Sequence, residues 1–173
     1  MASTPDFVTL RHNRDEVGRV EVHVRRALIA LVCLFLVAGL LNAFGQRPDT
    51  ATATTPAAAL KLYAPERVRS GLYYQARFTI DARNDIKNAI LVLDPGWVEG
   101  MTINTIEPGP LNEASHDGKL EFTLGHIQAG TSYIFFMQLQ VNPTNVGHRS
   151  QDVSLHDGSA VLTTIDREIT IFP

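Results

Sequence analysis

The chain has 173 residues, enough for one domain of ordinary size with additional segments. Its 15 basic and 18 acidic residues give a formal charge of −3, so no basic surface for nucleic acid is expected. The single cysteine, Cys33, excludes an intrachain disulfide.

The first 26 residues are polar and charged, and they are too few to form a domain of their own. Valines recur from residue 17 to residue 24, so residues 17–26 either extend the following helix or form a short strand. We assign residues 1–26 to an N-terminal cytoplasmic segment.

Residues 27–44, ALIALVCLFLVAGLLNAF, carry no charge, and Asn42 is their one strongly polar side chain. As a helix they would rise about 27 Å, close to the thickness of a bilayer core. A soluble domain rarely accommodates a helix that is apolar on every side. We therefore predict a transmembrane helix over residues 27–45, with residues 27–44 in contact with lipid.

A signal peptide is the competing interpretation of this stretch, because Arg25 and Arg26 precede it and "AFG" before Gln46 offers a cleavage pattern. The length of the stretch favours an uncleaved, single-pass anchor. Basic residues before the span orient it with its N-terminus in the cytoplasm, since only Arg47 follows closely. The expected location is the plasma (inner) membrane, with a periplasmic or extracytoplasmic C-terminal domain. The basic residues that precede the span, and so set this orientation, are Arg11, Arg14, Arg19, Arg25 and Arg26.

Residues 46–59 are dominated by Thr, Ala and Pro, a composition that predicts an extended spacer outside any core. From residue 60 onward, short apolar runs alternate with polar residues and are separated by Gly, Pro, Asn and Asp. This period of two, with frequent turn signals, predicts an all-β fold, an antiparallel immunoglobulin-like sandwich of seven or eight strands over residues 60–173. The expected strands are 60–64, 72–82, 88–94, 101–106, 119–124, 132–142, 150–156 and 160–172.

Two stretches carry a resemblance to a known family. They are RFTIDARNDIKNAILVLDPGWVEGMTI, residues 77–103, and DGKLEFTLGHIQAGTSYIFFMQLQVNPTNVG, residues 117–147. Together they resemble the conserved-repeat and cell-adhesion-related immunoglobulin-like domains of bacterial envelope proteins. The resemblance implies scaffolding, adhesion or interaction, and it supplies no catalytic residue. It also implies that Gly125, Ala129 and Gly130 mark a turn between two strands.

His-Asp-Gly occurs twice, at residues 116–118 and 156–158. Asp-Gly suits tight hairpin turns, and each triplet precedes an alternating segment, so we interpret both as turns. His116 and His156 remain weak candidates for a metal site, because short ligand spacings are missing. We expect no cofactor and no catalytic residues.

Five residues are candidates for contact with a protein partner. Trp97 is either a core plug or an exposed anchor. Ile134 and Phe136, on the outer face of an expected strand, either cover a loop or form a docking surface. Gly39 and Asn42 lie on a possible contact stripe of the membrane helix.

These features favour a non-catalytic accessory or assembly subunit of a larger complex of integral membrane proteins. The sandwich would dock while the helix anchors the chain. An envelope adhesion or binding module is the alternative, and a His-based external metal-binding protein is the second.

Overall fold

The structure is a computed structural model that describes residues 19–43 and 45–173. The chain divides into two compact units, residues 1–43 and residues 44–173, and each is described by itself. Of the predicted N-terminal segment, residues 1–18 lie outside the described residues.

The described part of the first unit forms the helix α1 (Arg19–Leu40), of which Val20–Leu40 is long and apolar enough to cross a membrane. The predicted helix is therefore confirmed with different bounds, because it begins before residue 27 and ends before residue 45. Its C-terminal end is a turn in which Asn42 has a φ of 55° and Ala43 N donates to the Ala38 carbonyl. A left-handed residue after the last turn is a common way to end a helix.

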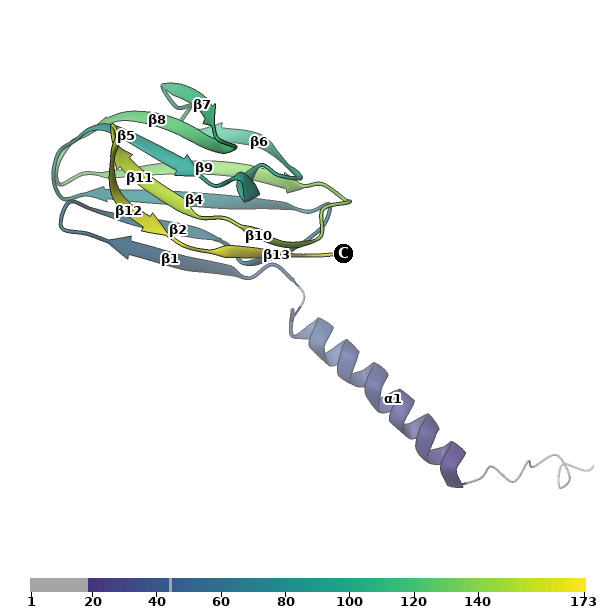
Figure 1. Cartoon of the computed structure of the whole chain (residues 1–173). Helices are drawn as coiled ribbons and strands as arrows, with labels where there is room; N and C mark the ends of the chain where they lie inside the picture. The colour runs from purple at the N-terminus through teal and green to yellow at the C-terminus, as the bar shows by residue number, and fades with distance from the viewer. Residues whose placement is uncertain (1–18, 44) are drawn as a thin grey trace, which may run out of the picture. The chain divides into compact units, whose positions relative to one another are not determined.

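The second unit is built from strands in three sheets (Figure 1). Sheet A has the order β1 (Pro48–Thr54), β2 (Ala58–Pro65), β4 (Tyr73–Ala82), β9 (Ser132–Val141) and β6 (Met101–Glu107). Sheet C has the order β12 (Ala160–Ile165), β11 (Val153–Asp157), β5 (Ile86–Leu93), β8 (Lys119–Ile127) and β7 (Asn112–His116). Sheet B has the order β10 (Gly147–Ser150), β13 (Glu168–Phe172) and β3 (Arg67–Arg69). All strand pairs are antiparallel except β13 with β3, so the all-β prediction is confirmed within the described residues.

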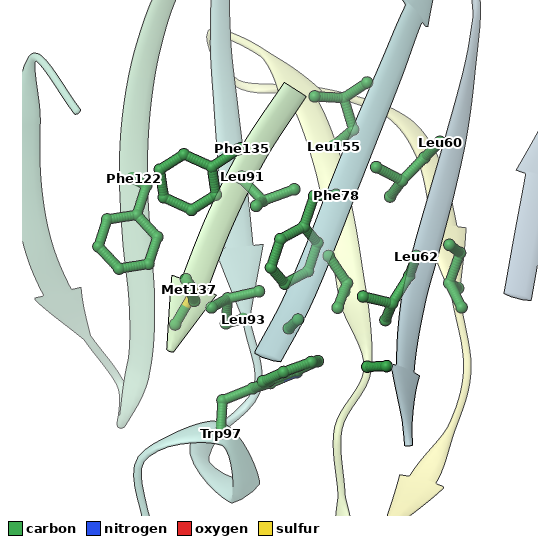
Figure 2. Close-up of a cluster of buried hydrophobic side chains, with 14 of the residues drawn as sticks. Leu60, Leu62, Phe78, Leu91, Leu93, Trp97, Phe122, Phe135, Met137 and Leu155 are labelled. Carbon is green, nitrogen blue, oxygen red and sulfur yellow. The ribbon is translucent and has the colours of Figure 1, made fainter. Parts of the chain in front are cut away.

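One hydrophobic core lies between the inner faces of sheets A and C (Figure 2). Alternate residues of each strand point into it, as the period of two predicts. The ring of Phe135 on β9 lies 5.3 Å from that of Phe122 on β8, so the two sheets meet through aromatic contacts. The ring of Phe78 on β4 lies 6.0 Å from that of Phe135 and 5.5 Å from that of Trp97.

The predicted spacer over residues 46–59 is wrong, because Pro48–Thr54 form β1, the edge strand of sheet A. Ala51 and Ala53 pack against the core, since they face Leu62 and Leu60 of β2. The composition is misleading here because an edge strand needs only small side chains on its inward face.

The predicted number of seven or eight strands is too low, since the described residues contain thirteen. The four strands β1, β3, β7 and β10 were not predicted. The predicted strand 160–172 is divided at Asp166 and Arg167, where the chain leaves sheet C as β12 and enters sheet B as β13.

The predicted turn around residues 125–130 is also shorter than expected. Gly125 lies within β8 with a φ of 86°, opposite Ala89 at a register shift, so it marks a bulge. A Cβ there would lie 2.6 Å from the Leu111 side chain, which covers this point. Ala129 and Gly130 do lie in the turn that leads to β9.

Candidate functional site

The outer face of sheet A, meaning the outward-pointing side chains of β2, β4, β9 and β6, is the main candidate site. On β9, Ile134 is 44% exposed and Phe136 is half-buried. Both point away from the core because Phe135 and Met137, their neighbours, point into it. Phe136 is paired on both sides, with Arg77 of β4 and Glu107 of β6, whereas Ile134 is paired with Thr79 of β4 and lies beyond the last residue of β9 that pairs with β6.

Charged side chains flank Phe136 in one row across the strands. Phe136 pairs with Arg77 of β4 and with Glu107 of β6. The Arg77 guanidinium lies 5.0 Å from the centre of the Tyr63 ring, the next residue of the row on β2. A guanidinium stacked on an aromatic ring keeps its N–H edge available for a carboxylate.

A shallow open hollow of about 310 Å³ lies beside Phe136 in this face. Three of its five lining residues carry an amide or a hydroxyl group, so it can exchange hydrogen bonds with polar groups of a partner. Glu107 is its one ionisable side chain. The lining residues are Gln75, Thr105, Glu107, Phe136 and Gln138.

Trp97, the third candidate, cannot be an exposed anchor because its side chain is completely buried. It belongs to the 3-10 turn η2 (Pro95–Trp97) and closes the core, as Figure 2 shows. Its indole N–H donates to the Asp152 carbonyl at 3.3 Å, and the Arg167 guanidinium lies 5.8 Å from the ring centre. The core-plug interpretation of Trp97 is the one that fits.

Gly39 and Asn42 lie in the first unit, at the end of α1 and in the turn after it. A Cβ at Gly39 would meet nothing within 4 Å. A contact of these two residues with a neighbouring helix therefore stays a prediction.

The His-Asp-Gly triplets are hairpin turns, as the sequence predicts. His116 pairs with Lys119, and the residues between them, Asp117 and Gly118, have φ values of 52° and 77°. Two successive positive φ values are typical of a type I′ turn. In the second triplet Asp157 ends β11 and pairs with Ala160, so Gly158 and Ser159 make the turn. Asp157 Oδ1 accepts a hydrogen bond from the Asn88 backbone N–H at 2.9 Å.

The sheet register separates His116 from His156. His156 is on β11, and β5 and β8 lie between that strand and β7, which carries His116. Three strand spacings amount to about 14 Å, too far for one metal ion to bind both imidazoles. Among residues 19–43 and 45–173, no group of three or more His, Cys, Asp or Glu side chains is placed to hold a metal.

The outer face of sheet C has a second hollow, of about 360 Å³, lined in part by Ser154 and His156. The Ser154 Oγ and the His156 Nε2 are 2.8 Å apart. Burial lowers the pKa of His156. The charge of Glu121 acts to raise this pKa and the charge of Lys119 acts to lower it, and the net shift is downward. No hydrogen bond joins the imidazole to a carboxylate in the described part of the chain, so the pair lacks the orienting acid of a catalytic triad.

A buried polar cluster, which the alternation of residues could not reveal, lies under sheet B. Gln151 Nε2 donates to the Tyr74 hydroxyl at 3.0 Å, and that hydroxyl donates to the Met101 sulfur at 3.0 Å. Arg167 Nη2 donates to the Pro65 carbonyl at 2.8 Å. Burial raises the pKa of Tyr74 to about 12, although Gln151 and Arg167 both act to lower it.

Comparison with known proteins identifies no family for this chain, since no family model and no curated protein matches it. Among solved structures, the GH20 exo-β-N-acetylglucosaminidase from Vibrio harveyi, in complex with N-acetylglucosamine, aligns with a TM-score of 0.31 and 10% identity. The alignment covers 73% of this chain and 18% of that one. A likeness at this TM-score carries no argument about fold or activity.

Proposed function

We propose that this chain is a non-catalytic accessory or assembly subunit of a membrane protein complex. In this proposal α1 anchors it in the plasma (inner) membrane and the extracytoplasmic β unit docks on its partner through the outer face of sheet A. The observation that carries the proposal is a pair of adjoining apolar side chains on β9: Ile134, which is exposed, and Phe136, which is half-buried and has a paired strand on each side. Exposed apolar side chains that adjoin one another on the outward face of a sheet are a feature of interaction surfaces.

Strand order supports the immunoglobulin-like part of the proposal. The order β2–β4–β9–β6 corresponds to the A–B–E–D sheet of an immunoglobulin domain. The strands β5, β11 and β12 lie in the order C–F–G, with the β7–β8 hairpin added next to β5. Domains with this architecture commonly act through their surfaces, without catalytic groups, although fold alone does not imply function.

The length of the connecting chain supports a partner in the membrane over a distant one. Only residues 41–47 separate the end of α1 from the start of β1. Seven residues reach at most about 25 Å, half the reach of the spacer predicted from the sequence. An adhesin that binds far from the membrane would need a longer connection.

The test is co-purification of the full chain in mild detergent, with identification of the proteins that accompany it. Ile134→Glu should remove the accompanying subunit, because a carboxylate in a buried apolar contact is costly. Val161→Glu is the matched control, since Val161 is 61% exposed on the outer face of sheet C. Loss of the same subunit in both variants, or in neither, would contradict the assignment of this face.

A further inference from the structure

The outer face of sheet A has opposite charges placed symmetrically about β9. Arg77 on β4, Phe136 on β9 and Glu107 on β6 are directly in register. In the row of Phe136, the strand to either side of β9 therefore carries one charge, positive on β4 and negative on β6.

Neither charge has an ion-pair partner among the described residues, since the salt bridges found there involve other side chains. Arg77 and Glu107 cannot pair with each other, because two strand spacings place their backbones about 10 Å apart with Phe136 between them. Arg77 and Glu107 can therefore each form an ion pair with an oppositely charged group of a partner.

We propose that the partner bound by this face is a second copy of the chain, related by a two-fold axis that runs parallel to β9 between the two facing sheets. This inference rests on the proposed function, whose docking face it uses. A rotation about that axis exchanges the β4 side for the β6 side and leaves each row at the same height. Arg77 of each copy then faces Glu107 of the other, while Phe136 and Ile134 meet their own equivalents on the axis. Such an isologous contact forms each ion pair twice.

The same axis satisfies the requirement of a shared membrane. A two-fold axis parallel to the strands keeps the start of β1, which follows the connection to α1, at the same end of both copies. A two-fold axis across the strands would place the two connections at opposite ends. Of these two axes, the one that keeps both connections at the same end is therefore the one that also matches the charges.

The size of the face suits a dimer that forms within a membrane. With the axis on β9, the strands that face each other are β4, β9 and β6, about 14 Å across, along about 27 Å from the row of Tyr73 to the row of Asp81, and β6 pairs with β9 only as far as Phe136. Both copies together would bury at most roughly 800 Å², which is small for a specific interface. Confinement of both anchors to one bilayer raises the effective concentration and compensates for the modest area.

Charge reversal in the full chain provides the first test. Arg77→Glu and Glu107→Arg should each weaken dimerisation about tenfold or more, because each places two like-charged pairs across the axis. The double variant should recover dimerisation to within about threefold of the wild type, because reversed charges still face each other. Light scattering of the protein in mild detergent gives the mass, which for two copies of a 19.0 kDa chain is 38 kDa plus detergent.

Cysteine cross-linking in native membranes locates the axis. In a Cys33→Ser background, Gln138→Cys places identical thiols on the axis, and oxidation should give a disulfide-linked homodimer. Lys61→Cys lies two strands away from the axis, so its two thiols would be about 19 Å apart and should not react. Thr164→Cys, exposed on the outer face of sheet C, controls for random collisions.

Three outcomes are distinguishable. A homodimer linked at Gln138→Cys alone, together with recovery in the double charge variant, supports the proposal. A different protein attached at Gln138→Cys, with no recovery in the double variant, overturns the two-copy inference and leaves the proposed function standing. No adduct at Gln138→Cys, with a monomeric mass for the wild type, overturns both.

Discussion

Among the glycines of the described residues, Gly96 has the least room for a side chain, and it gives the sharpest stability prediction. A Cβ built on Gly96 would lie 1.8 Å from the carbonyl oxygen of Ser150, at the end of β10. The ordinary separation of a carbon and an oxygen in contact is well over 3 Å, so one backbone segment must move by more than 1 Å. A change of side-chain rotamer cannot relieve this clash, because the obstructing atom belongs to the backbone.

Gly96→Ala should therefore destabilise the β unit by about 3 kcal/mol, the upper part of the usual range for overpacking. For a unit of this size that corresponds to a decrease in Tm of roughly 10 °C. Trp97, the only tryptophan, is buried next to the substitution, so its fluorescence reports unfolding of this region directly. The measurement is a thermal or urea melt of the full chain followed by that fluorescence.

Gly109→Ala is the matched control, because a Cβ at Gly109 meets nothing within 4 Å. It should melt within about 2 °C of the wild type, as surface substitutions usually do. If Gly96→Ala also melted within that margin, the close packing of η2 against β10 would be refuted.

Three further predictions concern single side chains. Burial raises the pKa of Tyr74 to about 12 in the folded state, so as the pH rises the tyrosine of the unfolded chain loses its proton first. The stability that this tyrosine contributes below pH 10 should therefore fall between pH 10 and 12. The urea midpoint of the wild type should decline more steeply over this range than that of Tyr74→Phe, and parallel curves would argue against a buried phenol. Gly118→Ala should cost about 1 kcal/mol in the same melts, since its φ of 77° is unfavourable for alanine, and an unchanged midpoint would contradict the type I′ turn. Lys119→Met should cost less than about 1 kcal/mol despite the 2.9 Å ion pair with Asp94, because the lysine is half exposed, whereas a larger loss would mean that the pair is shielded from solvent.

The alternation of apolar residues was sufficient to predict the central strands. In β4 and β9 every second residue is apolar and buried, so their faces follow from the sequence alone. β1 was missed because its inward residues are alanines, and β7 because all its residues are exposed. Neither strand has the hydrophobic signal on which the prediction depends.

The candidate site was predictable only in part. Ile134 and Phe136 are conspicuous because the stretch from residue 133 to residue 137 is apolar on both faces of its strand. Their relation to Arg77 and Glu107 depends on strand register, which is set by turns and bulges such as the shift between Ile103 and Thr105. Trp97 illustrates the converse, since its burial depends on η2 closing the core, and a loop sequence does not show this.

The central claim, that the outer face of sheet A binds a protein partner in the membrane, is tested most directly by photo-crosslinking in native membranes. A photoreactive amino acid replaces Ile134 in one sample and Val161 in another, and the adducts are identified by mass spectrometry. We expect one dominant protein adduct at position 134 and none at position 161. Equal labelling at both positions, or an adduct at position 161 alone, would contradict it.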